Sequence, residues 1–171
     1  MSRRQHHYPG FRTILLSFNL STLGIIIAVV IFLFARLYTI IDDMQNRIQQ
    51  YILLNQLSTE LKNSEYEFTL FFTEYREKST FGLTKEDKNS LKEIWNTSLN
   101  LRNQALYTTS RLEYEYEKSP EKYFLNRGIR SGIEFINTTC QEFLNEDFTL
   151  NTEAYKTYYQ VLKVFSEVIA Y

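Results

Sequence analysis

Four side chains in the second half of the chain have the chemistry of a binding site. Arg102, Arg127 and Arg130 fall near the middle of two expected helices, and Tyr155 opens a third. A guanidinium binds a carboxylate or phosphate through two parallel hydrogen bonds. Tyrosine adds apolar area with a polar tip. We therefore take these four as candidate ligand contacts. The alternatives are that the arginines pair with Glu113, Glu134 or solvent, and that the tyrosine belongs to the core.

Catalytic motifs are missing from the sequence. The two histidines, His6 and His7, precede the apolar segment, and Cys140 is a lone cysteine. This composition disfavours Ser-His-Asp and Cys-His catalysis and the usual zinc sites. Five dispersed glycines do not form a phosphate loop. We predict no catalytic residue, no metal ligand and no cofactor. The net charge of −1 also argues against nucleic acid as a partner.

A charge-free run of 23 residues, from Thr13 to Ala35, lies between Arg12 and Arg36. As a helix it would be about 35 Å long, enough for the roughly 30 Å hydrocarbon core of a bilayer. Arginines concentrate before the run, whereas residues 36–171 carry 16 Lys and Arg against 20 Asp and Glu. By the positive-inside rule, we expect residues 1–12 to be a basic cytoplasmic tail. Residues 13–35 would be a transmembrane helix and 36–171 an extracytoplasmic domain of the cell membrane.

Apolar residues after this run recur at steps of three and four, as in amphipathic helices. Breaks are expected around Gly82, before Pro120, and between Asn145 and Asn151. The predicted helices end near Lys78 and Lys118, begin at Pro120, and begin again after Asn151 or Thr152. Short connections favour neighbours that run in opposite directions. The predicted fold class is all-α, with one N-terminal transmembrane helix continuing into an extracytoplasmic antiparallel four-helix bundle.

Three details add to this prediction. Ile41, Met44, Ile48 and Tyr51 form one stripe, which continues after an irregular step as Leu54, Leu57, Leu61, Phe68, Phe71 and Tyr75. The pair Gly128 and Gly132, four residues apart, would let a neighbouring helix approach closely. A ligand-sensitive weak point is the alternative for this pair. Thr84 and Asp87 match a capping box, and Ser119 suits a helix N-cap.

The first helix is expected to extend about 43 residues beyond the membrane, whereas the last helix has only about 20 residues with which to return. At 1.5 Å per residue, the last helix would end roughly 30 Å short of the membrane. We therefore expect the parent polypeptide to continue past Tyr171, with the bundle truncated at its C-terminus. The alternative is a short protein whose bundle is uneven.

The layout resembles that of a known family. The stretches "FRTILLSF", "NSEYEFTLFFTEYREKS" and "YKTYYQVLKVFSEV" are similar to the sensor region of membrane histidine kinases of the YesM type. The resemblance implies the input half of a two-component kinase and a homodimer. It also implies an unidentified small-molecule, peptide or binding-protein ligand. The kinase residues of such proteins are absent from this chain. The alternatives are a chemoreceptor ligand-binding bundle, a membrane-anchored helical scaffold and, least favoured, an enzyme.

Overall fold

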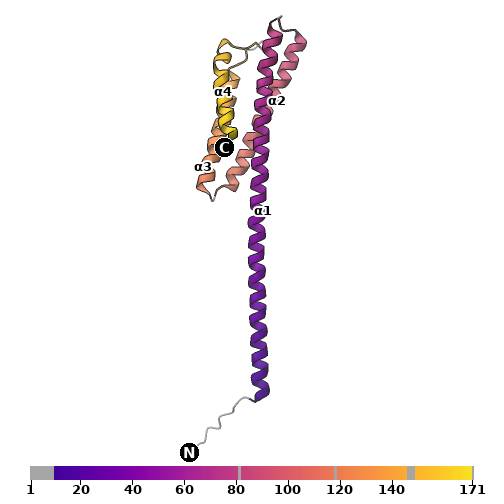
Figure 1. Cartoon of the computed structure of the whole chain (residues 1–171), viewed down its shortest axis with the longest axis vertical. Helices are drawn as coiled ribbons and strands as arrows, with labels where there is room; N and C mark the ends of the chain where they lie inside the picture. The colour runs from indigo at the N-terminus through magenta and orange to yellow at the C-terminus, as the bar shows by residue number, and fades with distance from the viewer. Residues whose placement is uncertain (1–9, 81, 118, 146–148, 171) are drawn as a thin grey trace, which may run out of the picture. The chain divides into compact units, whose positions relative to one another are not determined.

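The computed structural model describes residues 10–80, 82–117, 119–145 and 149–170. They form four helices: α1 (Phe11–Ser79), α2 (Lys85–Glu115), α3 (Pro120–Gln141) and α4 (Thr152–Ala170) (Figure 1). The only strand-like pairing among the described residues is an isolated bridge between Leu144 and Leu150. The predicted all-α class is confirmed. The chain divides into two compact units, Met1–Arg47 and Ile48–Tyr171, which are described separately below.

The first unit contains the apolar part of α1. By length and composition this helix is long enough to cross a membrane, and the side chains of its apolar window are exposed to the surroundings. Exposed apolar surfaces of this size mark sites of interaction with a membrane or another protein. The coarse expectation of a candidate membrane span is met. Residues 1–9 of the predicted cytoplasmic tail lie outside the described residues.

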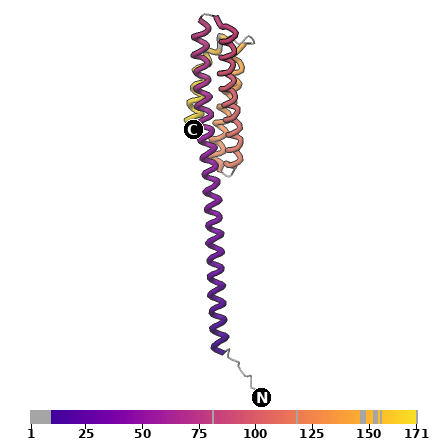
Figure 2. The backbone as a smooth tube through the Cα atoms, turned by 90° about the vertical axis from the view of Figure 1, so that its right-hand side faces the viewer, coloured from indigo at the N-terminus to yellow at the C-terminus, as the bar shows by residue number. Residues whose placement is uncertain are grey.

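The second unit is held together by side chains from all four helices, which lie side by side in both views (Figures 1 and 2). One apolar cluster is rich in aromatic rings. The ring centroid of Phe68 lies within 6.2 Å of the ring centroids of Phe72, Trp95, Phe143, Tyr158 and Phe165. The second cluster is mainly aliphatic and includes Leu53, Leu57, Leu112 and Ile133. Large rings in offset contact bury much apolar area, so these clusters supply the main packing energy of the unit.

Helix ends follow the expected local chemistry with one exception. Gly82 has φ +85° and ends the turn after α1. Thr84 accepts from the Asp87 backbone, and the Asp87 side chain accepts from the Thr84 backbone, so the capping box is confirmed. Ser119 precedes Pro120, but its side chain makes no capping hydrogen bond. The missing N–H of proline and its fixed φ therefore define this start without help from the serine. α2 ends at Glu115, about one turn before the predicted end near Lys118, which itself lies outside the described residues.

The two parts of the predicted apolar stripe lie on different faces of α1. Ile48 and Tyr51 are exposed, whereas Leu53, Leu57 and Leu61 are buried. The irregular step explains the change, because two successive steps of three from Tyr51 to Leu57 turn the face by about 120° at 100° per residue. The expectation that Ile48, Tyr51 and Leu54 belong to the bundle's buried stripe was wrong, and Leu53 is buried in place of Leu54.

The two glycines of α3 differ in their surroundings. A Cβ placed on Gly132 would overlap Cγ2 of Val168 on α4, whereas a Cβ on Gly128 would meet nothing within 4 Å. Only Gly132 allows the close approach of a neighbour. The expectation of a paired packing site is therefore confirmed at Gly132 and wrong at Gly128.

Candidate functional site

Arg102 lies inside the second unit and not on its surface. Its side chain extends from α2 and is 1% exposed. Nε donates to Oδ1 of Asn137 on α3 at 2.6 Å. Nη1 donates to Oγ of Ser98 at 2.6 Å and more weakly to Oγ of Ser64 on α1 at 3.4 Å. The guanidinium thus joins three helices through neutral partners.

The two serines are arranged to accept from this cation. Ser64 Oγ donates to the Ser98 carbonyl at 3.0 Å, and Ser98 Oγ donates to the Ser64 carbonyl at 2.8 Å. Each hydroxyl has a single hydrogen. Because both hydrogens point to carbonyls, the hydroxyl lone pairs face the guanidinium. The close contact between α1 and α2 at this point depends on these small polar residues.

Arg102 has no ionic counterpart in the described part of the chain, where no Asp or Glu pairs with it. Burial lowers the pKa of Arg102, although an arginine remains charged in proteins. A buried charge without an ionic partner costs stability, even where neutral groups accept its hydrogen bonds.

Cys140 lies close enough to interact electrostatically with this charge. It is buried, and burial raises the pKa of its thiol to about 11, with the positive charge of Arg102 acting in the opposite direction. The thiol is therefore protonated at neutral pH. A protonated buried thiol is a weak nucleophile, so Cys140 behaves as an apolar core residue.

Glu60 is a second buried charge, 7% exposed, which the sequence analysis missed. Its Oε2 accepts from Thr108 Oγ1 at 3.0 Å and its Oε1 from Gln56 Nε2 at 2.8 Å. No Lys, Arg or His pairs with it among the residues that the structure describes. Its position was a usable signal, because Glu60 is three residues after Leu57 and four before Ser64 on the buried face.

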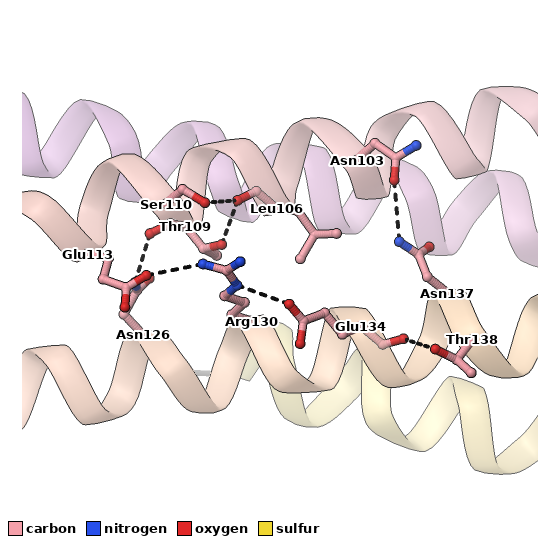
Figure 3. Close-up of polar contacts among 10 residues, drawn as sticks. All are labelled: Asn103, Leu106, Thr109, Ser110, Glu113, Asn126, Arg130, Glu134, Asn137 and Thr138. Atoms are coloured by element: carbon pink, nitrogen blue, oxygen red, sulfur yellow. Dashed lines mark hydrogen bonds and ion pairs between the residues drawn. The ribbon is translucent and has the colours of Figure 1, made fainter.

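Arg130 is occupied by two acids on the surface of α2 and α3. Its Nη1 lies 3.1 Å from Oε2 of Glu113, and its Nε lies 3.0 Å from Oε1 of Glu134 (Figure 3). The hydrogen bond to Glu134, and then the negative charges of both carboxylates, raise the pKa of Arg130. Arg130 therefore forms surface ion pairs, which was the alternative to a role as a ligand contact.

The remaining candidates are dispersed. Arg127 is exposed, with its guanidinium carbon 5.9 Å from the ring centroid of Tyr123. The side chain of Tyr155 lies outside the described residues. Arg102 is therefore buried, Arg127 is exposed, and Arg130 pairs with Glu113 on α2 and Glu134 on α3, so the three arginines have different surroundings.

Asn126 is a buried polar residue at the interface between α2 and α3, and only part of its side chain is hydrogen-bonded. Its Nδ2 donates to the Thr109 carbonyl at 2.8 Å (Figure 3). Its Oδ1 is the one buried side-chain nitrogen or oxygen in the described residues that lacks a partner. An unsatisfied buried acceptor weakens packing locally.

Two surface hollows of the second unit are open to the surroundings, and Arg102 lines neither of them. One of about 320 Å³ is lined by Leu53, Ser110, Arg111, Tyr114 and Glu115. Another of about 340 Å³ is apolar and includes Leu54, Leu57, Ile129 and Val168. Within the described ranges no group of three or more acidic, histidine or cysteine side chains could hold a metal ion.

Comparison with known proteins gives no match for this chain, whether among family models, curated proteins or solved structures. Its function must therefore be inferred from its own chemistry, in which the distinctive element is the polar layer of Glu60, Ser64, Ser98, Arg102 and Asn137 inside an apolar core.

Proposed function

We propose that this chain is the extracytoplasmic signal-sensing region of a two-component sensor histidine kinase. Residues 1–12 would lie in the cytoplasm, 13–35 in the bilayer, and 36–171 outside as an antiparallel four-helix bundle. The candidate span in α1 supports the anchor. Contacts of Glu60 with Thr108 and of Ser64 with Ser98 support the antiparallel order, because rising numbers on α1 meet falling numbers on α2.

The observation that carries the proposal is the buried, unpaired charge of Arg102. Replacing buried charges by well-packed apolar residues often leaves a protein as stable or more stable, so stability alone is a weak reason to keep one. Glu60 and Arg102 each form a hydrogen bond with the residue one turn earlier in their own helix. Glu60 accepts from Gln56, and Arg102 donates to Ser98. Because α1 and α2 are proposed to run oppositely, the two side chains lean apart. A small slide of α1 along α2 would change both sets of contacts, which suits a two-state switch.

The proposed ligand is a small molecule, a peptide or a binding protein with an anionic group. Arg127 is the accessible arginine of the candidate set, and Tyr155 would add an aromatic contact. A carboxylate reaching Arg130 must compete with Glu113 and Glu134. Arg102 would be reached only if helices separate, so its proposed role is in the response and not in first contact.

The coding sequence after the Tyr171 codon tests the kinase proposal. Support would be a second apolar run of about 20 residues followed by a helix with a phospho-accepting histidine and an ATP-binding domain. A long coiled coil in place of these domains would favour a chemoreceptor bundle. A stop codon directly after Tyr171 would overturn both.

Membrane orientation needs its own test. Alkaline phosphatase fused after Ser79 should be active, and green fluorescent protein fused at the same point should be dark, since the first requires export. The reverse result would place the helical unit inside the cell and overturn the sensing topology.

A second candidate function is a membrane-anchored helical scaffold. It is favoured by the openness of these two hollows, because drug-sized ligands usually occupy clefts that enclose most of their surface. A complete reading frame ending at Tyr171 would select this candidate.

A further inference from the structure

A row of large apolar side chains on α1 has no partner within the described part of the chain. Leu37, Ile41, Met44, Ile48 and Tyr51 are 50–72% exposed. They succeed one another at steps of four, three, four and three residues, and one further step of four reaches the exposed Asn55. This alternation is the 3.5-residue repeat of a coiled-coil seam.

The part of the row that lies in the second unit, Ile48 and Tyr51, points away from the core of that unit. Ile48 is half exposed, whereas Leu57 is 3% exposed. Nine residues separate them, which is two and a half helical turns and places them on opposite sides of α1. The packing of α2, α3 and α4 on the Leu57 face therefore leaves the Ile48 face free.

The residue types along the row are those of a two-stranded parallel coiled coil. Ile41, Ile48 and Asn55 occupy the first core position of the heptad, called a, and Leu37, Met44 and Tyr51 occupy the second, called d. β-Branched residues at a with Leu at d favour parallel dimers. The isoleucines at a and Leu37 at d follow this rule, and Met44 and Tyr51 are large apolar residues at the other d positions. A single Asn at an a position sets register and strand number at a cost in stability.

Charged residues in this segment are compatible with the seam. Asp42 and Asp43 fall on the outward heptad positions b and c, so two copies would not bring these carboxylates together. Arg47 flanks the seam at position g, where its methylene groups can cover apolar surface. The seam thus buries apolar side chains without burying charge.

We propose that residues 37–55 of α1 form a parallel, in-register coiled coil with a second copy of this chain. The seam is complementary to itself, and a shared membrane span in α1 would give every copy the same orientation. When two identical helices run in the same direction and in register, each a residue packs against the a residue of the other helix, and each d residue against the other d residue. The inference goes beyond the proposed sensing function and does not require a kinase output.

Disulfide trapping tests the seam with the full chain in membrane vesicles. Met44→Cys and Ile48→Cys place a thiol in the seam, whereas the matched controls Asp43→Cys and Asn46→Cys place it on the outward positions c and f. The parent chain supplies the background, because its buried Cys140 thiol has a pKa of about 11 and should not cross-link. We expect the seam variants to form covalent dimers at least about tenfold faster than the controls, because only a and d positions face their counterparts. Equal rates at all four positions, or no dimer at any, would overturn the proposal.

Asn55 provides a second, non-covalent test. In mild detergent the full chain should have the mass of a dimer. Asn55→Val should add larger oligomers, because the residue that limits strand number is lost. Asn63→Val, at an outward position two turns later, is the control and should remain dimeric. A monomeric parent chain, or an Asn55→Val variant with an unchanged mass distribution, would contradict the assigned seam.

Discussion

Arg102 donates from Nε to Oδ1 of Asn137 at 2.6 Å, so a guanidinium that is 1% exposed is held by a neutral amide. The other buried charge among the described residues, Glu60, is likewise held by the neutral side chains of Thr108 and Gln56. The interface between α1 and α2 thus carries one cation and one anion that do not pair. Such an arrangement costs stability, and its consequences can be measured.

Arg102→Met should raise the free energy of unfolding by about 1 kcal/mol or more, because a long apolar side chain replaces an unpaired buried charge. Ser64 and Ser98 keep their reciprocal hydrogen bonds in this variant. Denaturant unfolding of the full chain in mild detergent, followed by circular dichroism, measures the change. Arg127→Met is the exposed control, expected within about 0.5 kcal/mol of the parent. A clear loss of stability in Arg102→Met would mean that the guanidinium is a structural tie.

Gly132→Ala should destabilise the protein by about 1–2 kcal/mol, because the new Cβ overlaps Val168 on α4 and overpacking outweighs the better helix propensity. Val168 relieves this overlap poorly, since β-branched side chains in helices have one preferred rotamer. Gly128→Ala is the matched control and should stabilise by up to about 1 kcal/mol, since its Cβ meets nothing within 4 Å. Thermal unfolding of both variants makes the comparison, and equal shifts would contradict the close contact between α3 and α4.

Thr84→Ala should cost about 1 kcal/mol, because it removes the hydroxyl that caps α2. Ser119→Ala should change little, since the Ser119 side chain makes no capping bond to α3. Melting temperatures of the two single variants measure this difference. A larger effect at Ser119 than at Thr84 would reverse the assignment of the two caps.

The capping box also has a pH dependence. Hydrogen bonds from Thr84 lower the pKa of Asp87 below its usual value of 3.8. The stabilisation by the carboxylate is therefore complete above that value and is lost as the pH falls through the lower folded-state pKa. Stability measured between pH 5 and pH 2 should fall less steeply in Asp87→Asn than in the parent chain.

Cys140 should make stability fall at alkaline pH. Burial raises the pKa of its thiol from the ordinary 9.0 to about 11, so the folded state holds this proton more tightly than the unfolded state. The stabilisation is complete below pH 9 and is lost as the pH rises toward 11, an effect of about 2 kcal/mol. Unfolding free energies at pH 8.5 and 11 should diverge more in the parent chain than in Cys140→Ala. Burial also raises the pKa of Tyr116, which contributes to the same window in both proteins and cancels in the comparison. Parallel pH profiles would place Cys140 in a more polar setting.

Local features of the structure could be predicted from the sequence because they depend on neighbours a few residues away. The charge-free run from Thr13 to Ala35 indicated the apolar part of α1, and the steps of three and four indicated helices. Gly82 and Pro120 marked breaks because of their own backbone constraints, and they fall at the end of α1 and the start of α3. Thr84 with Asp87 was a complete signal for the start of α2.

Tertiary structure decided which faces and side chains meet. Periodicity identified apolar positions on α1, but contacts with distant residues selected the Leu57 face for burial and left the Ile48 face exposed. The partners of Arg102 on α1 and α3 are 38 and 35 residues away, and Glu60 meets Thr108 across 48 residues. Spacing along one helix specifies a direction, whereas the register between helices specifies what stands in that direction. For this reason the sequence by itself determined the helices and the candidate span, and only the packed unit revealed two buried charges without ionic partners.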